Sequence, residues 1–292
     1  MNADMTTGTQ EIITAINEIK FHPNIFKDYV LPFVIPLFSA VFGYFVAVKL
    51  FARQEKTKAI IIKIERTNEF IIHMIDSLQS LIAIKEIYYR HITAEPYQRT
   101  LSITKIQVIL NTNVINTAYM AFVSFGYNES SQGQYDETWN NVVRINTMVS
   151  NYRYLVKLIS ERNEASSDFL NAANEHIYNT GTVTHEINIE ALTNKNKILL
   201  IGLMDKTEQL LRLVDDLIIE IYNFLTNIHT AVKSVLNVKL VKEHVTLLMY
   251  RNDAPEFQEM LARIIQPDYE ALGLIFGLPE VQVRELYKSG YR

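Results

Sequence analysis

A run of twenty consecutive uncharged residues, Tyr29–Val48, constrains this chain more than any other feature of its sequence. At about 1.5 Å per residue a helix of this length spans roughly 30 Å, the thickness of a bilayer's hydrocarbon core. Pro32 and Pro36 would destabilise a soluble helix, but membrane helices tolerate them. We therefore predict a transmembrane helix over residues 29–50, in preference to a buried core helix. The run is too long, and lies too far into the chain, for a signal peptide.

Basic residues gather on the C-terminal side of this run. Six of them lie between residues 49 and 66, whereas only Lys20 and Lys27 precede the run. The positive-inside rule then places the C-terminal side in the cytoplasm. We expect a single-pass protein of the inner (plasma) membrane, with residues 1–28 outside as a short tail. Four isoleucines of that tail share one face of an amphipathic helix: Ile12, Ile13, Ile16 and Ile19.

The composition narrows the function classes that remain. Charged residues make up 21% of the chain and the net charge is −4, so bulk electrostatics give no sign of nucleic-acid binding. There is no cysteine, which excludes disulfides, zinc–thiolate sites and cysteine nucleophiles. Nine glycines and seven prolines in 292 residues leave few turns, which favours long helices. We find no motif for a phosphate loop, a metalloprotease or a serine hydrolase, and we expect no cofactor and no metal.

Two heptad patterns predict long helices after the anchor. The first runs from Ile60 to Ile92, where Glu95-Pro96 is expected to stop the helix. The second runs from Leu203 to Val238 and is interrupted only by Thr207. We predict its centre to be the main packing seam, formed by Leu210, Val214, Leu217, Ile221, Phe224 and Ile228. The acidic residues between these positions are expected on a solvated face: Asp215, Asp216 and Glu220.

The predicted fold class is therefore all-α, with one N-terminal transmembrane helix and a long-helix bundle or coiled coil. Residues 51–252 form the cytoplasmic bundle in this interpretation. The uncharged segment Ile106–Asn128 leaves two alternatives, a buried bundle helix or a second membrane span. Its several Asn and Thr side chains favour the bundle helix, because unpaired amides are costly in lipid.

Residues 253–292 are predicted to form a small C-terminal helical module. Its segment YEALGLIFGLPEVQVRELYKSG resembles a helix-turn-helix, with a small residue at Gly273, Gly277 four residues later in the turn, and Val283 and Leu286 as inward positions of the second helix. Three basic residues could meet phosphates: Arg284, Lys288 and Arg292. Glu280 and Glu285 oppose them, so the face is nearly neutral and argues against a nucleic-acid partner.

One residue pair raises the question of catalysis. In RTNEFIIH, Arg66 and His73 lie seven residues apart, which is two helical turns on one face. The spacing resembles the catalytic motif of HEPN-type ribonucleases, in which such a pair acts on an RNA phosphodiester. The alternative is a solvated face on which Arg66 and His73 pair with Glu69 and Asp76.

A broader resemblance is carried by an aromatic-glycine stretch, FVSFGYNES, followed by the helix NYRYLVKLISE. The two together resemble membrane-anchored phage abortive-infection proteins. The residues concerned are Phe125, Gly126, Tyr127, Tyr152, Arg153, Tyr154 and Leu155. The resemblance implies an all-helical cytoplasmic body on a membrane anchor and a role in phage defence, and it assigns no catalytic residue. That family commonly has more than one N-terminal hydrophobic segment, whereas this sequence has one.

The sequence thus favours a membrane-tethered helical interaction protein that works through helix association at the bilayer, by self-association or with another protein. A phage-defence role is the specific form that the resemblance implies. The alternatives are a membrane-anchored HEPN-like ribonuclease that uses Arg66 and His73, or a tethered nucleic-acid binder that uses the C-terminal module.

Overall fold

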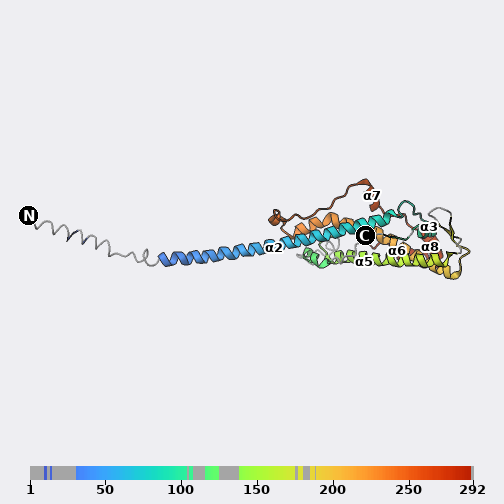
Figure 1. Ribbon diagram of the computed structural model, residues 1–292, viewed down its shortest axis with the longest axis horizontal. Coiled ribbons are helices and arrows are strands. Elements are labelled where there is room, and N and C mark those ends of the chain that lie inside the picture. The colour runs from blue at the N-terminus through green and yellow to red at the C-terminus, as the bar shows by residue number, and fades with distance from the viewer. Residues whose placement is uncertain are drawn as a thin grey trace, which may run out of the picture. The chain divides into compact units, whose positions relative to one another are not determined.

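The computed structural model describes residues 10–11, 14, 31–103, 105–107, 116–124, 138–174, 177–179, 185–187 and 189–290 (Figure 1). For residues 177–179 and 185–187 it describes the backbone alone. The chain divides into two units, Met1–Ala59 and Ile60–Arg292. The predicted isoleucine face of the N-terminal tail, as well as Phe125, Gly126, Tyr127 and Arg292, lies outside the described residues.

Helix α2 spans Leu31–Glu86 and begins with the apolar run. Within the described part of the chain it is the one helix that is long and apolar enough to cross a membrane. Pro36 lies inside the helix without ending it. Every residue from Leu31 to Lys56 is exposed, so the apolar side chains of this stretch are not buried in a core. The prediction of one long apolar N-terminal helix is confirmed.

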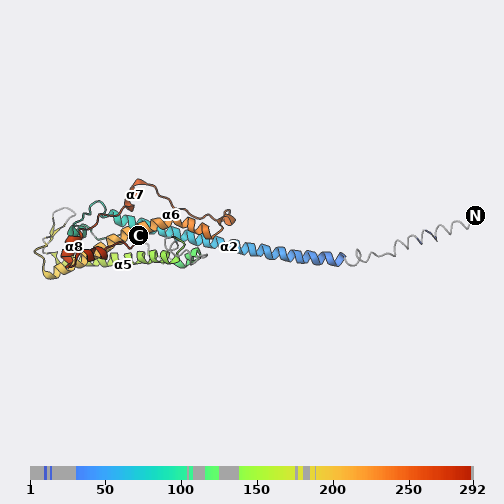
Figure 2. The same ribbon diagram turned by 180° about the vertical axis from the view of Figure 1, so that it is seen from behind.

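The second unit is built on three long helices that lie side by side in both views (Figures 1 and 2). They are Ile60–Glu86 of α2, α5 (Val142–Ala172) and α6 (Asn194–Val235). Lys85 pairs with Asp215 while Phe70 packs on Phe224, so α6 runs antiparallel to α2. The helical bundle is confirmed. Among the described residues, the regular secondary structure is helical apart from a short antiparallel pair of strands, β1 (Ile177–Asn179) and β2 (His185–Ile187).

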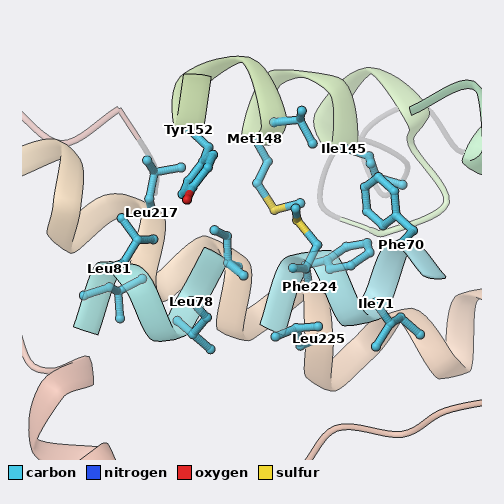
Figure 3. Packing of buried hydrophobic residues seen from close by; sticks show 14 of the residues in the cluster. Phe70, Ile71, Leu78, Leu81, Ile145, Met148, Tyr152, Leu217, Phe224 and Leu225 are labelled. Carbon is cyan, nitrogen blue, oxygen red and sulfur yellow. The ribbon is translucent and has the colours of Figure 1, made fainter. Parts of the chain in front are cut away.

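One apolar core joins these three helices. Figure 3 shows part of this core, with Leu78 and Leu81 from α2, Met148 and Tyr152 from α5, and Leu217 from α6. The rings of Phe70 and Phe224 meet edge to face, with their centroids 5.5 Å apart. Such an arrangement is the one that aromatic pairs prefer.

The six residues of the predicted seam on α6 are all fully buried in this core: Leu210, Val214, Leu217, Ile221, Phe224 and Ile228. Burial on α6 extends well beyond that stripe, because Leu211, Ile218 and Leu225 are buried too. Helix α6 is therefore enclosed on most of its sides, which an amphipathic surface helix is not.

The first long helix ends earlier than predicted. Helix α2 stops at Glu86, and turns follow to His91. Glu95-Pro96 does not stop a helix but starts one, α3 (Pro96–Leu101). The Glu95 carboxylate accepts hydrogen bonds from the backbone N–H groups of Tyr97 and Gln98, and Pro96 occupies the first helical position. An N-cap acceptor followed by proline is a start signal, and the prediction was wrong on this point.

The uncharged segment is described in part. Residues 117–124 form a 3-10 helix, η2 (Thr117–Ser124), which packs on α5 and α6 and buries Met120, Phe122 and Val123. The bundle helix predicted here is therefore a short 3-10 helix over these residues. Residues 108–115 and 125–128 lie outside the described part.

The chain continues after α6 through η5 (Val238–Val241), α7 (Pro255–Leu261), α8 (Tyr269–Phe276) and α9 (Glu280–Leu286). Asp268 caps α8, and Gly277 ends it with a φ of 67°. Val283 and Leu272 enter a second core cluster with Leu203 of α6, as the helix-turn-helix interpretation expects. Leu286 is exposed instead of inward, because Tyr287, four residues after Val283, takes the inward position.

We expect Gly273→Ala to destabilise this turn. A Cβ at residue 273 would lie 2.7 Å from the Leu278 carbonyl oxygen, which is backbone and cannot rotate away. The expected loss is about 1–3 kcal/mol of unfolding free energy, typical of overpacking. The matched control is Gly202→Ala on α6, where a Cβ has nothing within 4 Å and alanine favours helix by about 1 kcal/mol. Thermal unfolding in detergent measures both, and a Gly273→Ala melting temperature at or above wild type would contradict the close approach.

Candidate functional site

The acidic residues of α6 are buried, and the prediction of a solvated face was wrong. Asp215, Asp216 and Glu220 are each only 2–3% exposed. Glu208, about two helical turns before Asp215, is equally buried. Because α6 is enclosed on most of its sides, these carboxylates face other segments of the chain. Each is paired with a cation from a segment distant in sequence. Buried charges are tolerated only when they are paired in this way.

Glu208 holds helix α3 through Arg99. The guanidinium donates two hydrogen bonds to the carboxylate, from Nε at 2.6 Å and from Nη2 at 2.9 Å. Its Nη1 donates to the carbonyls of Thr93 and Ile265. Burial raises the pKa of Glu208, and Arg99 opposes this rise in part. The planar fork suits a bidentate pair that fixes orientation as well as position.

Asp215 joins α6, α2 and the segment after α7. The Lys85 ammonium donates to its Oδ1 at 2.6 Å and also to the carbonyls of Met260 and Ala262. The other carboxylate oxygen accepts the Ile264 N–H at 2.8 Å. All three protons of the ammonium are therefore used, which is the satisfied geometry that a buried pair needs.

Asp216 holds the end of the described chain. It accepts hydrogen bonds from the Ser289 hydroxyl at 2.6 Å and from the Gly290 N–H at 3.1 Å, and it pairs with Arg263 at 2.7 Å. Asp215 and Asp216 together therefore fasten residues 260–290 to the central helix.

Glu220 makes the corresponding link to α5. Arg144 donates to it at 2.8 and 3.0 Å, and the same guanidinium lies 4.1 Å from the centroid of the Trp139 ring. Trp139 in turn meets Phe224 edge to face at 5.0 Å. Through Trp139, the Arg144–Glu220 pair therefore lies beside the part of the core in which Phe70 packs on Phe224.

Two further polar groups are buried near the network, Arg162 with hydrogen-bond partners and the Tyr88 hydroxyl without one among the described residues. Arg162 of α5 is fully buried and donates to the Thr207 hydroxyl and to the carbonyls of Thr100 and Ile103. Burial lowers the pKa of Arg162 to about 10, so it stays charged at neutral pH. The Tyr88 hydroxyl is also buried, and burial together with the charge of Asp215 raises its pKa well above the ordinary value.

The side chains of this network are paired with one another and hold segments of the chain together. Its carboxylates are committed to guanidinium, ammonium, hydroxyl and backbone partners, so they are not available to take a proton from a substrate. Among the described residues there is no group of three His, Asp or Glu side chains placed to hold a metal ion. What the arrangement does is fix α3, α5 and the C-terminal segment around α6.

The network also shows which residues the sequence analysis missed. Five cations were not predicted to belong to a site, because their partners lie far away in the sequence: Lys85, Arg99, Arg144, Arg162 and Arg263. One signal was present for Lys85 and Thr207, which occupy otherwise apolar heptad positions. Both are fully buried. A polar residue at an otherwise apolar heptad position thus indicates a buried partner.

Arg66 and His73 both lie on α2, about 10 Å apart along its axis at 1.5 Å per residue. Arg66 is exposed, and its guanidinium lies 4.7 Å from the centroid of the Tyr119 ring. His73 is half-buried, and its backbone carbonyl accepts the Ser77 hydroxyl. RNA cleavage by this pair stays a hypothesis.

Two of the three basic residues predicted to meet phosphates, Arg284 and Lys288, have partners within the module. Arg284 pairs with Glu280 and lies 4.5 Å from the Tyr269 ring centroid, while Lys288 pairs with Glu285 at 3.3 Å. The face is as neutral in the structure as the sequence suggested for these two residues.

Comparison with family models, curated proteins and solved structures finds no match to this chain. Of the helix that carries the abortive-infection resemblance, Tyr152 and Leu155 lie in the core and Arg153 and Tyr154 are exposed.

Proposed function

We propose that this chain is a single-pass membrane protein whose cytoplasmic helical bundle acts by binding a second copy or another protein. The apolar part of α2 is the anchor. The basic residues that follow it in sequence support an orientation with the N-terminus outside and the bundle in the cytoplasm, at the plasma membrane.

The proposed membrane anchor is supported by the exposure of its apolar side chains. Fourteen large apolar side chains between Leu31 and Phe51 are exposed. Leaving one such side chain in water instead of burying it costs about 1.5–3 kcal/mol. Together the fourteen leave roughly 20–40 kcal/mol of burial free energy unrealised in water. A lipid environment removes this cost, which is why we assign the helix to the bilayer.

Charges placed in this stretch are expected to release the protein from the membrane. Phe38→Asp/Phe42→Asp puts two carboxylates near the middle of the span, each of which costs roughly 3 kcal/mol on insertion. Because both side chains are exposed, the bundle keeps its packing. Cell fractionation followed by alkaline carbonate extraction should find wild type in the membrane pellet and the variant in the supernatant or degraded.

The matched control is Val143→Asp, an exposed apolar side chain of the bundle, which should stay in the pellet. A reporter that is active only in the cytoplasm, fused after Arg292, should be active in wild type. Extraction of wild type by carbonate would overturn the anchor, and activity of a periplasm-dependent reporter at the same site would overturn the orientation.

The association part of the proposal rests on the C-terminal pair of short helices. Leu274 of α8 is 81% exposed and Val281 of α9 is 73% exposed. Large apolar side chains that no core covers are typical of a protein-binding surface. Arg284 and Lys288 of the same module are each paired with a glutamate, so apolar contact would provide most of the binding energy.

The specific role that we propose is phage defence, on the strength of the sequence resemblance. Cells that produce the protein should plate phage less efficiently than cells that do not, by at least tenfold for a susceptible phage. Leu274→Asp/Val281→Asp should lose this protection at unchanged abundance, because it removes the apolar contact without disturbing the core. Equal plating on cells with and without the wild-type protein, across a broad phage panel, would remove the defence role.

The same assay separates this proposal from the ribonuclease alternative. Arg66→Ala and His73→Ala should keep their protection, since the interaction proposal gives them no chemical task. Loss of protection in either variant, with unchanged abundance and assembly, would favour the ribonuclease.

A further inference from the structure

A groove whose lining includes three lysines lies where α6 ends. Its volume is about 1070 Å³, and it is lined by the last turns of α6, by η5 and by the segment that follows. Three exposed lysines line it, Lys233, Lys239 and Lys242, together with half-buried or buried apolar side chains such as Val235 and Leu236. None of the residues named in its lining is acidic.

The groove lies at the end of the bundle that joins the anchor in sequence. Since α6 runs antiparallel to α2 with Phe224 beside Phe70, Val235 lies about 16 Å further along α6. Ile60 lies about 15 Å from Phe70 in the same direction, so the two are at the same level. Asn68 ties the segment after η5 to α2, through hydrogen bonds of 2.9 Å with the Thr246 carbonyl and the Leu248 N–H.

The distance from this end to the bilayer is limited by the chain itself. Ile60 follows Leu50 by ten residues, which reach at most about 35 Å when fully extended and about 15 Å as a helix. The groove therefore belongs to the part of the bundle that can reach lipid headgroups.

The charges of the three groove lysines are not neutralised by ion pairs among the described residues. Within the part of the chain that the structure describes, no ion pair involves Lys233, Lys239 or Lys242, whereas Lys85, Arg99, Arg144 and Arg263 each have a carboxylate partner. The neighbouring Glu243 is exposed and lies outside the lining, and it leaves the cluster with a net charge of about +2.

We propose that this groove binds the phosphate headgroup of an anionic phospholipid of the membrane in which the protein is anchored, an inference that rests on the proposed membrane span. The lysines bind the phosphate, and the apolar floor takes the glycerol and the first part of the acyl chains. Leu240, partly exposed between Lys239 and Lys242, adds an apolar contact at the interface. A lysine near an anionic surface strengthens binding about fivefold, so three give roughly 100-fold.

The test uses the full chain in neutral detergent micelles. The protein has no cysteine, so Asn237→Cys, at an exposed groove position, takes a single environment-sensitive dye. Short-chain phosphatidylglycerol should shift the dye emission with saturation, while phosphatidylcholine should not. Lys233→Gln/Lys239→Gln/Lys242→Gln should weaken the phosphatidylglycerol response about 100-fold.

The matched control is Lys105→Gln/Lys195→Gln/Lys197→Gln, which removes the same charge away from the groove and should bind as wild type does. Equal responses to both lipids, equal weakening by the two triple variants, or tighter binding of inorganic phosphate or a short RNA than of phosphatidylglycerol would each overturn the proposal. The titration in micelles does not depend on the bilayer span. The lipid-binding proposal can therefore be contradicted while the wild-type protein still resists carbonate extraction. The two proposals are thus tested separately.

Discussion

Leu217→Asp is expected to prevent stable folding of the bundle. Leu217 is fully buried at the middle of α6, where α2 and α5 meet it. Loss of a buried leucine side chain costs about 2–5 kcal/mol, and an unpaired carboxylate in the same place adds several more. The sum is comparable with the whole stability of a typical domain, roughly 5–15 kcal/mol. The variant should therefore be degraded in cells, or be cut rapidly by protease in isolated membranes.

The matched control is Ile198→Asp on the same helix, where the side chain is 69% exposed. It should accumulate and resist protease as wild type does. Because a single chain already buries Leu217 completely, we expect the fold itself to fail. Loss of cross-linked oligomers with an intact, protease-resistant monomer would mean that the seam is formed between chains. Wild-type behaviour of Leu217→Asp in all these measurements would contradict the packing of α6.

The long helices could be predicted because their apolar spacing records the core directly. Residues that recur at intervals of three and four must share one face of a helix, and a face of that length has to be buried. The turn between α8 and α9 could be predicted for a similar local reason. Gly277 adopts a positive φ, which favours glycine, and the sequence marks it.

The charged network could not be predicted from the sequence, because the burial of charged residues on α6 depends on how many other segments pack around that helix. Charged residues between apolar ones usually face water, and that rule fails for a helix enclosed on most of its sides. Asp215 and Glu208 are acceptable there only through Lys85 and Arg99, which come from more than a hundred residues earlier in the chain. The heptad position of Lys85 indicates a buried partner, but nothing local in the sequence says which residue that partner is. The helix end at Glu86 was missed for a related reason, since apolar spacing continues into the turn through the buried Tyr88.

The second large effect is expected at the Lys85–Asp215 pair. Lys85→Met removes the cation but leaves the Asp215 carboxylate buried, and it also leaves the carbonyls of Met260 and Ala262 without their donor. Breaking a buried pair in this way costs about 3–5 kcal/mol. For a bundle of this size the melting temperature in detergent should fall by roughly 10 °C. The segment from Met260 to Ile264 should become an early site of proteolysis, because the same pair fastens it.

A second substitution shows whether the loss comes from the stranded charge. Asp215→Asn in the Lys85→Met background removes that charge and keeps an acceptor for the Ile264 N–H. The double variant should therefore be more stable than Lys85→Met alone by at least 1 kcal/mol, although a carboxylate is the better partner in wild type. Lys157→Met, whose ion pair with Glu161 is largely exposed, is the matched control and should change stability by less than about 1 kcal/mol. If Lys85→Met were as mild as Lys157→Met, Asp215 would have to be reached by water, and α6 would not be the enclosed central helix that the rest of the fold requires.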